Sequence, residues 1–293
     1  MAHPARAIHP SIAALLKEHP GKWDPKEIIR GLARKRVAHA KGHRWHGPPF
    51  CPKQFASIFG IRCREVAHEI GGDGRLLLQR DGKPLIEYRK QSMVERQRFT
   101  IFHEFAHTLF PDFGTLVPHH HTPGVSMTPE EKEFEYLCDV AAAEMLMPVD
   151  DFEKDLQKHP AGQAGAVHAL RQLYQASVDA TIHRLIDFES RLPCAAVFLT
   201  DQRGKFEGAG PLWVKYSAIG KHFGTFIWPG TTAPEGSVAL QCYNRGIDIP
   251  GQKQETWLVR GKEMRCMVQA IKLPAIPEAP DYAKVVALLV AAR

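Results

Sequence analysis

The chain has 293 residues, a formal net charge of +6 at pH 7 and hydrophobic residues at 44% of its positions, which is enough for two or three domains with hydrophobic cores. Its first residues lack the apolar stretch of a signal peptide, and no apolar run approaches the ~18 residues of a membrane-spanning helix, so we expect a cytoplasmic protein with no membrane partner. The six cysteines include no C-x-x-C pair, which favours free thiols over a disulfide framework.

The first segment, residues 1–49, is basic and helical in pattern. The sequence Asp-Pro-Lys-Glu at residues 24–27 is typical of a helix N-terminus, with proline at the first helical position. Basic residues in this segment could contact nucleic acid, but solvated helix faces explain them equally well and no base-stacking aromatic pattern accompanies them. The residues concerned are Lys35, Arg36 and Arg44.

A second group of side chains in the same region contains potential metal ligands. These are His39, His43, His46 and Cys51. Their spacing matches no recognised ligand pattern, so we favour an interpretation without a metal ion at this place.

The next residues predict a short helix followed by a small sheet. The helix covers residues 53–59, and strand-like segments follow at residues 60–66, 76–80 and 84–88. Asp-Gly at residues 81–82 is a strong signal for a hairpin between the last two. We interpret Leu85–Tyr88 as an edge strand that could pair with an extended substrate.

The pentapeptide His-Glu-Phe-Ala-His at residues 103–107 lies in a stretch with helical periodicity. Histidines at positions i and i+4 lie on one helix face, about 6 Å apart along the axis, where both can bind one zinc ion. This geometry makes His103 and His107 candidate metal ligands. Glu104 could take a proton from a water molecule beside the metal, as in the H-E-x-x-H pattern of metallopeptidases.

A second predicted helix begins with a capping box and ends before Pro148. Its N-cap is Thr128 and its N3 carboxylate is Glu131. Glu135 and Asp139 follow one turn apart, beside apolar positions where an unpaired carboxylate is costly. Glu135 would complete the three protein ligands of a catalytic zinc site, and Asp139 would orient a ligand imidazole. The alternative is a solvated acidic face on this helix.

These two segments resemble the ImmA/IrrE family of zinc metallopeptidases. That family carries R-F-T, two hydrophobic residues and H-E-x-x-H, as at residues 98–107, and then E-x-x-C-N/D-x-x-A-A-x-x-L-x-P, as at residues 135–148. The resemblance implies the same roles for the same residues. The zinc ligands are His103, His107 and Glu135, the general base is Glu104, and Asp139 stands where the family has Asn or Asp. We expect Zn²⁺, with Mn²⁺ as a substitute.

The connection between the two helices, residues 111–127, is long and rich in histidine, which departs from the family pattern. One histidine of His119, His120 and His121 could donate a hydrogen bond to the oxyanion of a tetrahedral intermediate. A solvated loop is the favoured interpretation of this stretch.

The C-terminal half changes from helical to strand-like. Residues 161–191 resemble a helix-turn-helix, with Ser177 as the N-cap of its second helix. Six segments then predict strands separated by Gly/Pro turns, at residues 194–200, 212–217, 225–228, 237–243, 255–260 and 264–270. We expect the last apolar stretch, Val285–Ala292, to form a packed terminal helix.

We therefore predict an α+β protein with four parts. They are a basic helical segment (1–49), a zinc metallopeptidase domain of helices with a short sheet (50–160), a helix-turn-helix-like segment (161–191) and a β-rich, GAF-like domain (192–293). The expected function is zinc-dependent endopeptidase activity. The resemblance implies a specific protein substrate, such as a helix-turn-helix transcriptional repressor. The alternative is a non-proteolytic regulatory or DNA-binding protein that retains the zinc site, which the intact Glu104 disfavours.

Overall fold

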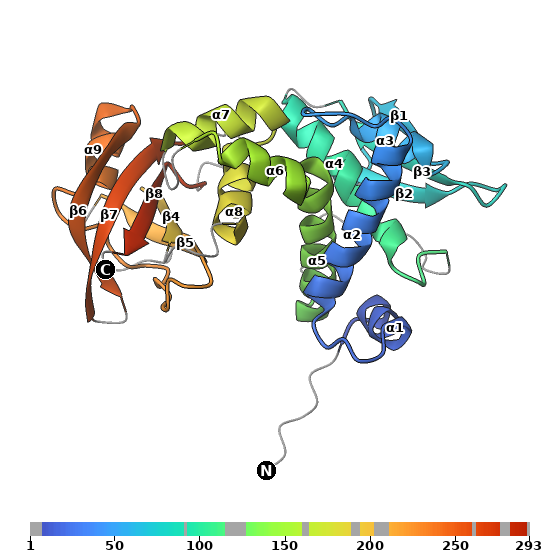
Figure 1. Ribbon diagram of the computed structural model, residues 1–293, viewed down its shortest axis with the longest axis horizontal. Coiled ribbons are helices and arrows are strands. Elements are labelled where there is room, and N and C mark those ends of the chain that lie inside the picture. Colours follow the sequence, from blue (N-terminus) through green and yellow to red (C-terminus); the bar gives the residue numbers. More distant parts are fainter. Residues whose placement is uncertain are drawn as a thin grey trace, which may run out of the picture. The chain divides into compact units, whose positions relative to one another are not determined.

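The structure is a computed structural model that describes residues 8–90, 93–114, 127–159, 164–188, 194–201, 211–259, 262–275 and 282–291. The chain divides into two compact units. The first unit contains Met1–Phe152 and Leu173–Ala176, and the second contains Glu153–Gln172 and Ser177–Arg293. Helices and a small three-stranded sheet make up the first unit, and a five-stranded sheet dominates the second (Figure 1). The predicted α+β class is confirmed.

The first unit opens with two helices and continues to the motif-bearing pair. Its elements are α1 (Pro10–Glu18), α2 (Pro25–Gly42), α3 (Pro52–Ile58), α4 (Val94–Ala106), the 3-10 turn η1 (His107–Leu109) and α5 (Pro129–Leu146). The predicted start of α2 is confirmed, because the Asp24 carboxylate accepts a hydrogen bond from the Lys26 N–H at 2.9 Å. Next to it lies α5 (Figure 1), and Arg34 of α2 forms an ion pair with the buried Glu144 of α5.

The small sheet has three strands, β1 (Arg62–Val66), β2 (Gly74–Leu78) and β3 (Pro84–Arg89). The predicted hairpin between β2 and β3 is confirmed, with Gly82 in the left-handed region at φ +76°. The prediction of an edge strand at Leu85–Tyr88 is wrong, because β3 lies in the middle of the sheet, between parallel β1 and antiparallel β2. All four of these residues are buried, which suits a strand with neighbours on both sides.

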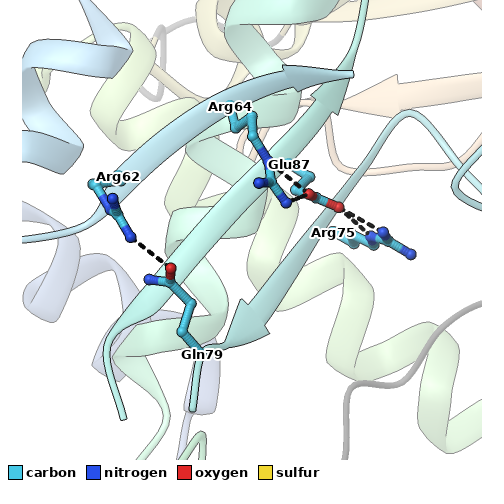
Figure 2. Close-up of polar contacts among 5 residues, drawn as sticks. All are labelled: Arg62, Arg64, Arg75, Gln79 and Glu87. Carbon is cyan, nitrogen blue, oxygen red and sulfur yellow. Dashed lines mark hydrogen bonds and ion pairs between the residues drawn. The ribbon is translucent and has the colours of Figure 1, made fainter. Parts of the chain in front are cut away.

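A buried carboxylate ties the three strands together (Figure 2). Glu87 of β3 accepts hydrogen bonds from Arg64 of β1 and Arg75 of β2, the residues directly opposite it in the sheet. Only 1% of the Glu87 side chain is exposed. Burial by itself would raise its pKa, but the hydrogen bonds and charges of the two arginines outweigh that effect and lower the pKa. The ionised carboxylate therefore stabilises the sheet that lies beside α4.

The second unit is built on one antiparallel sheet. Its elements are α8 (Val178–Phe188), β4 (Cys194–Thr200), β5 (Trp213–Ile219), α9 (Val238–Arg245), β6 (Ile249–Val259), β7 (Lys262–Lys272) and β8 (Val285–Ala291). The strands follow the order β5-β4-β8-β7-β6. Alternate residues of β4, β7 and β8 form one core with Val238, Ala239 and Cys242 of α9. The predicted strands near 194–200, 212–217, 255–260 and 264–270 are confirmed.

Three predictions in this unit are wrong. The segment at 225–228 is not a strand; Gly224 and Pro229-Gly230 flank it. The segment at 237–243 belongs to α9, where the Ser237 hydroxyl caps the Leu240 N–H at 3.3 Å and Gly246 ends the helix at φ +67°. The last apolar stretch forms β8 at Val285–Ala291 instead of the expected helix. A short apolar run has no period that distinguishes a buried strand from a buried helix, which is why the sequence did not reveal the strand.

The helices that follow the first sheet and precede the second in the sequence agree with the prediction. They are α6 (Val149–Leu156) and α7 (Ala164–Tyr174), followed by α8. The predicted cap of α8 is confirmed, since the Ala180 N–H donates to the Ser177 hydroxyl at 3.0 Å.

All six cysteines are free thiols. Among the described helices, none is long and apolar enough to cross a membrane.

The arrangement around Glu87 predicts a pH-dependent contribution to stability. Replacing Glu87 with Gln removes a charge that two arginines compensate, so the free energy of unfolding at pH 7 should fall by about 1–3 kcal/mol. Because the folded-state pKa is lowered, this contribution is complete above the ordinary carboxyl pKa of ~4.3 and is lost as the pH falls through the folded-state value.

Urea unfolding of wild type and Glu87→Gln, measured from pH 7 to pH 3, tests this expectation. The difference between the two proteins should shrink below about pH 4. Glu65→Gln is the control, since Glu65 is an exposed carboxylate on the neighbouring β1. Equal stability of wild type and Glu87→Gln at pH 7 would contradict a stabilising role for the charge.

Candidate metal centre

Helix α4 positions the two histidines of the H-E-x-x-H motif. It buries Ile101, Phe102 and Phe105 in the core of the first unit, with 0–1% of each residue exposed. His103 lies on a partly exposed side of the helix, and His107 follows where α4 tightens into η1. The two imidazole rings lie with their centroids 5.1 Å apart. The motif therefore has the helical geometry that the sequence predicts.

Helix α5 brings the candidate third ligand to these histidines. Its predicted capping box is confirmed, since the Thr128 hydroxyl accepts from the Glu131 N–H at 3.2 Å and the Glu131 carboxylate accepts from the Thr128 N–H at 2.7 Å. Packing of α5 on α4 then places Glu135 Oε2 at 2.9 Å from His103 Nε2.

One nitrogen each of His103 and His107 and one carboxylate oxygen of Glu135 lie within 4.8 Å of one another. Two ligand atoms at about 2.0 Å from a tetrahedral zinc ion are about 3.3 Å apart, so small side-chain movements suffice to bring these three donors around one ion. Two imidazoles and a carboxylate are also a typical ligand set of catalytic zinc. The residues present fit a zinc ion, and their binding of metal stays a prediction.

Asp139 lies where an orienting carboxylate is expected. The second ring nitrogen of His103, Nδ1, donates to Asp139 Oδ1 at 2.8 Å, which leaves Nε2 facing Glu135. Burial would lower the pKa of His103, but its hydrogen bonds to Asp139 and Glu135 outweigh burial and raise the pKa to about 10. Since a histidine binds metal without the proton on the ligating nitrogen, a metal ion competes with that proton for Nε2.

Glu104 is held in a different environment from the other carboxylates. Only 9% of the residue is exposed, and burial raises its pKa to about 7, against the opposing effects of the His103 charge and a hydrogen bond from the Leu76 backbone in β2. A carboxyl group with a pKa close to neutrality can both accept and return a proton. The residue suited to general-base chemistry thus lies beside the candidate ligands.

Cys138 has a neighbour that the sequence interpretation missed. It is fully buried, and its Sγ lies 3.6 Å from His107 Nδ1. The thiol therefore contacts the ring nitrogen of a candidate ligand. The i+3 spacing of Glu135 and Cys138 on one helix was the available signal.

The other candidate residues do not join this cluster. His39, His43, His46 and Cys51 are all described, yet the group of His103, His107 and Glu135 is the one set of three close metal-binding side chains within the described part of the chain. His43 instead places Nδ1 at 2.9 Å from the His39 carbonyl oxygen. The three loop histidines, His119, His120 and His121, lie outside the described residues.

Two helices that present H-E-x-x-H and a carboxylate as the third candidate ligand have the arrangement typical of metallopeptidases. Residues 56–186 match the IrrE N-terminal-like domain. The chain is also 27% identical over 228 residues to the radiation response metalloprotease IrrE of Deinococcus deserti, which covers 70% of this chain and 79% of that protein. The chain therefore contains an IrrE N-terminal-like domain and is a distant homologue of the IrrE metalloprotease.

A solved structure supports the fold at lower sequence similarity. The Mycobacterium tuberculosis transcriptional regulator superimposes with a TM-score of 0.55 and 13% identity, covering 90% of this chain and 87% of that one. At this identity the match concerns the fold. The similarity extends over both units of the present chain, beyond the residues that match the IrrE N-terminal-like domain.

The hydrogen bond between Asp139 and His103 predicts a graded effect on zinc affinity. Asp139→Ala should weaken zinc binding roughly 10–100-fold, because the ring of His103 loses the acceptor that orients it. Asp139→Asn should weaken it less, since the amide oxygen can still accept from Nδ1. Competition titration with a zinc chelator measures both constants. Unchanged affinity in Asp139→Ala would show that the contact does not support the metal site.

Proposed function

We propose that this protein is a zinc-dependent endopeptidase that cleaves a specific regulatory protein in the cytoplasm. The observation that carries the proposal is the convergence of His103, His107 and Glu135, with the buried Glu104 on the same helix as the two histidines. The homology to a radiation response metalloprotease supports the same reaction class.

The roles of the residues follow from their chemistry and positions. His103, His107 and Glu135 would hold the ion, and Asp139 would keep Nε2 of His103 directed at it. Bound zinc supplies a Lewis acid that polarises the scissile carbonyl group and acidifies water. Glu104 would accept the proton of the attacking water and return it to the leaving amine.

The small sheet offers a place for an extended substrate. Among the described strands, β2 is at the edge of the sheet, and its Leu76 backbone contacts Glu104. A peptide that adds to the free edge of β2 as a further strand would pass close to the general base. This replaces the strand-addition role that the sequence interpretation gave to Leu85–Tyr88.

The identity of the substrate is argued from the family resemblance, which implies a helix-turn-helix transcriptional repressor. The second unit, with its β5-β4-β8-β7-β6 sheet, would contribute recognition or sensing, and a GAF-like fold is our proposal for it. A non-proteolytic regulator or DNA-binding protein with a retained zinc site is the competing function. It gives no reason for a buried glutamate next to the candidate ligands.

Two substitutions separate metal binding from catalysis. Glu135→Ala should lose about one equivalent of zinc, whereas Glu133→Ala, on the same helix, should retain it. Glu104→Gln keeps shape and ligands, so zinc content and melting temperature should stay near wild type. Its cleavage rate should fall by about 10²–10⁴-fold, the usual contribution of general acid–base catalysis.

Zinc content is measured by atomic absorption. Cleavage is measured with a purified helix-turn-helix repressor as the candidate substrate and with unfolded casein. Cleavage by wild type and equal cleavage by Glu104→Gln would contradict the mechanism. If the wild-type protein binds zinc and DNA but cleaves neither test protein, the competing function is favoured. Zinc loss in Glu133→Ala instead of Glu135→Ala would identify a different carboxylate ligand.

A further inference from the structure

Strand β2 approaches helix α4 most closely at Gly74. A Cβ atom at this position would lie 2.5 Å from Thr100 Cγ2, 3.0 Å from Glu104 Cγ and 3.1 Å from Glu104 Oε1. Carbon atoms in favourable contact lie about 3.5–4.0 Å apart, so no side chain fits between β2 and α4 here. The backbone of β2 therefore lies directly against the side chain of the candidate general base.

The backbone conformation does not explain this glycine. Gly82 and Gly60 have positive φ angles, which L-residues adopt rarely, but Gly74 does not. Gly72, two residues earlier and also without a positive φ, has room for a Cβ, whose nearest contact would be the Gly74 carbonyl oxygen at 3.7 Å. A glycine inside a strand weakens it and often marks the close approach of another group. At Gly74 that group is Glu104.

The close approach restricts a side chain that would otherwise have several rotamers. Glutamate has three side-chain torsions, and its conformation must be fixed for proton transfer to be efficient. On one side, Glu104 meets the bare backbone at Gly74, and the Leu76 backbone donates a hydrogen bond to its carboxylate. A short stretch of β2 thus supports the carboxylate through backbone contacts alone.

We propose that Gly74 is a positioning residue for Glu104. Its missing side chain lets β2 lie against the glutamate and hold the carboxylate where the proton is transferred. This inference rests on the proposed peptidase function and adds to it a strand residue that does not contact substrate or metal in this role.

The neighbours of Gly74 allow a variant that separates packing from positioning. In Gly74→Ala the shortest contact is with Thr100, a buried β-branched residue, and the next two are with Glu104. Thr100→Ser removes Cγ2 and with it the 2.5 Å contact. The double variant Gly74→Ala/Thr100→Ser should therefore fold normally, while the new methyl group still displaces Glu104 by a few tenths of an ångström.

The test compares wild type, Gly72→Ala, Thr100→Ser, Gly74→Ala and the double variant. Zinc content and melting temperature report on folding, and kcat and KM on the repressor report on catalysis. Two small ligands of the zinc protein give a readout independent of turnover. Acetohydroxamate carries N–H and O–H groups that can donate to a neighbouring carboxylate, whereas azide has no donor.

In the double variant we expect wild-type zinc content and melting temperature, a kcat lowered about tenfold, and a KM within about twofold, because misplacement of a catalytic group mainly affects the chemical step. Acetohydroxamate affinity should fall about tenfold, with azide affinity unchanged, because the variant alters a carboxylate contact and leaves the metal ligands in place. Gly72→Ala and Thr100→Ser should behave as wild type.

Wild-type kcat and acetohydroxamate affinity in the folded double variant would overturn the inference and leave Gly74 with a packing role alone. Equal losses in Gly72→Ala would also overturn it. If wild type binds zinc but cleaves no peptide bond, the proposed function fails, and the ratio of the two ligand affinities still decides whether Gly74 positions Glu104.

Discussion

The candidate site depends on the packing of α5 against α4. Neither helix holds a complete ligand set, because His103 and His107 belong to the α4 segment and Glu135 belongs to α5. Their convergence requires both helices to keep their rotation and register. The apolar side chains that α4 and α5 bury fix the rotation, and the capping box at Thr128 fixes where α5 begins. The hydrogen bond between His103 and Asp139 is a further link between the two helices.

The same packing brings several ionisable groups close together, from the buried Glu104 to the half-exposed Asp139. Such groups are costly unless they are paired or meet a cation. Glu135 and Asp139 compensate the charge of a protonated His103 through direct hydrogen bonds. Glu104 is buried instead, and burial raises its pKa to about 7. The difference between these carboxylates corresponds to different proposed roles, since ligands must be ionised and a general base must exchange its proton. The sheet contributes through β2, which lies against Glu104.

Local sequence signals predicted the parts of the site that depend on helical spacing. The H-E-x-x-H spacing, the capping box and the i, i+4 pair of Glu135 and Asp139 each refer to a single helix, whose geometry is known in advance. Contacts between different helices and strands depend on tertiary packing and were not predictable from these local signals. The contact of Cys138 with His107 and the approach of Gly74 to Glu104 join different elements.

Two of the errors in the fold, in the small sheet and in the last strand, have the same origin. Val285–Ala291 are apolar throughout, and the place of this segment in the middle of the second sheet makes it a strand. For residues 237–243, the serine cap and the glycine stop were local helix signals that the strand prediction did not use. The order of strands in the small sheet follows from the pairing of β1 with β3, which joins segments separated by β2 in the chain.

The central claim is that one zinc ion binds between α4 and α5 through two imidazoles and a carboxylate. X-ray absorption at the zinc K-edge of the purified wild-type protein tests it most directly. The account predicts a first shell of nitrogen and oxygen at roughly 2.0–2.2 Å, with the outer-shell scattering of two imidazole rings. A zinc–sulfur distance of about 2.3 Å, as Cys138 would give, or scattering from fewer than two imidazoles would contradict the claim.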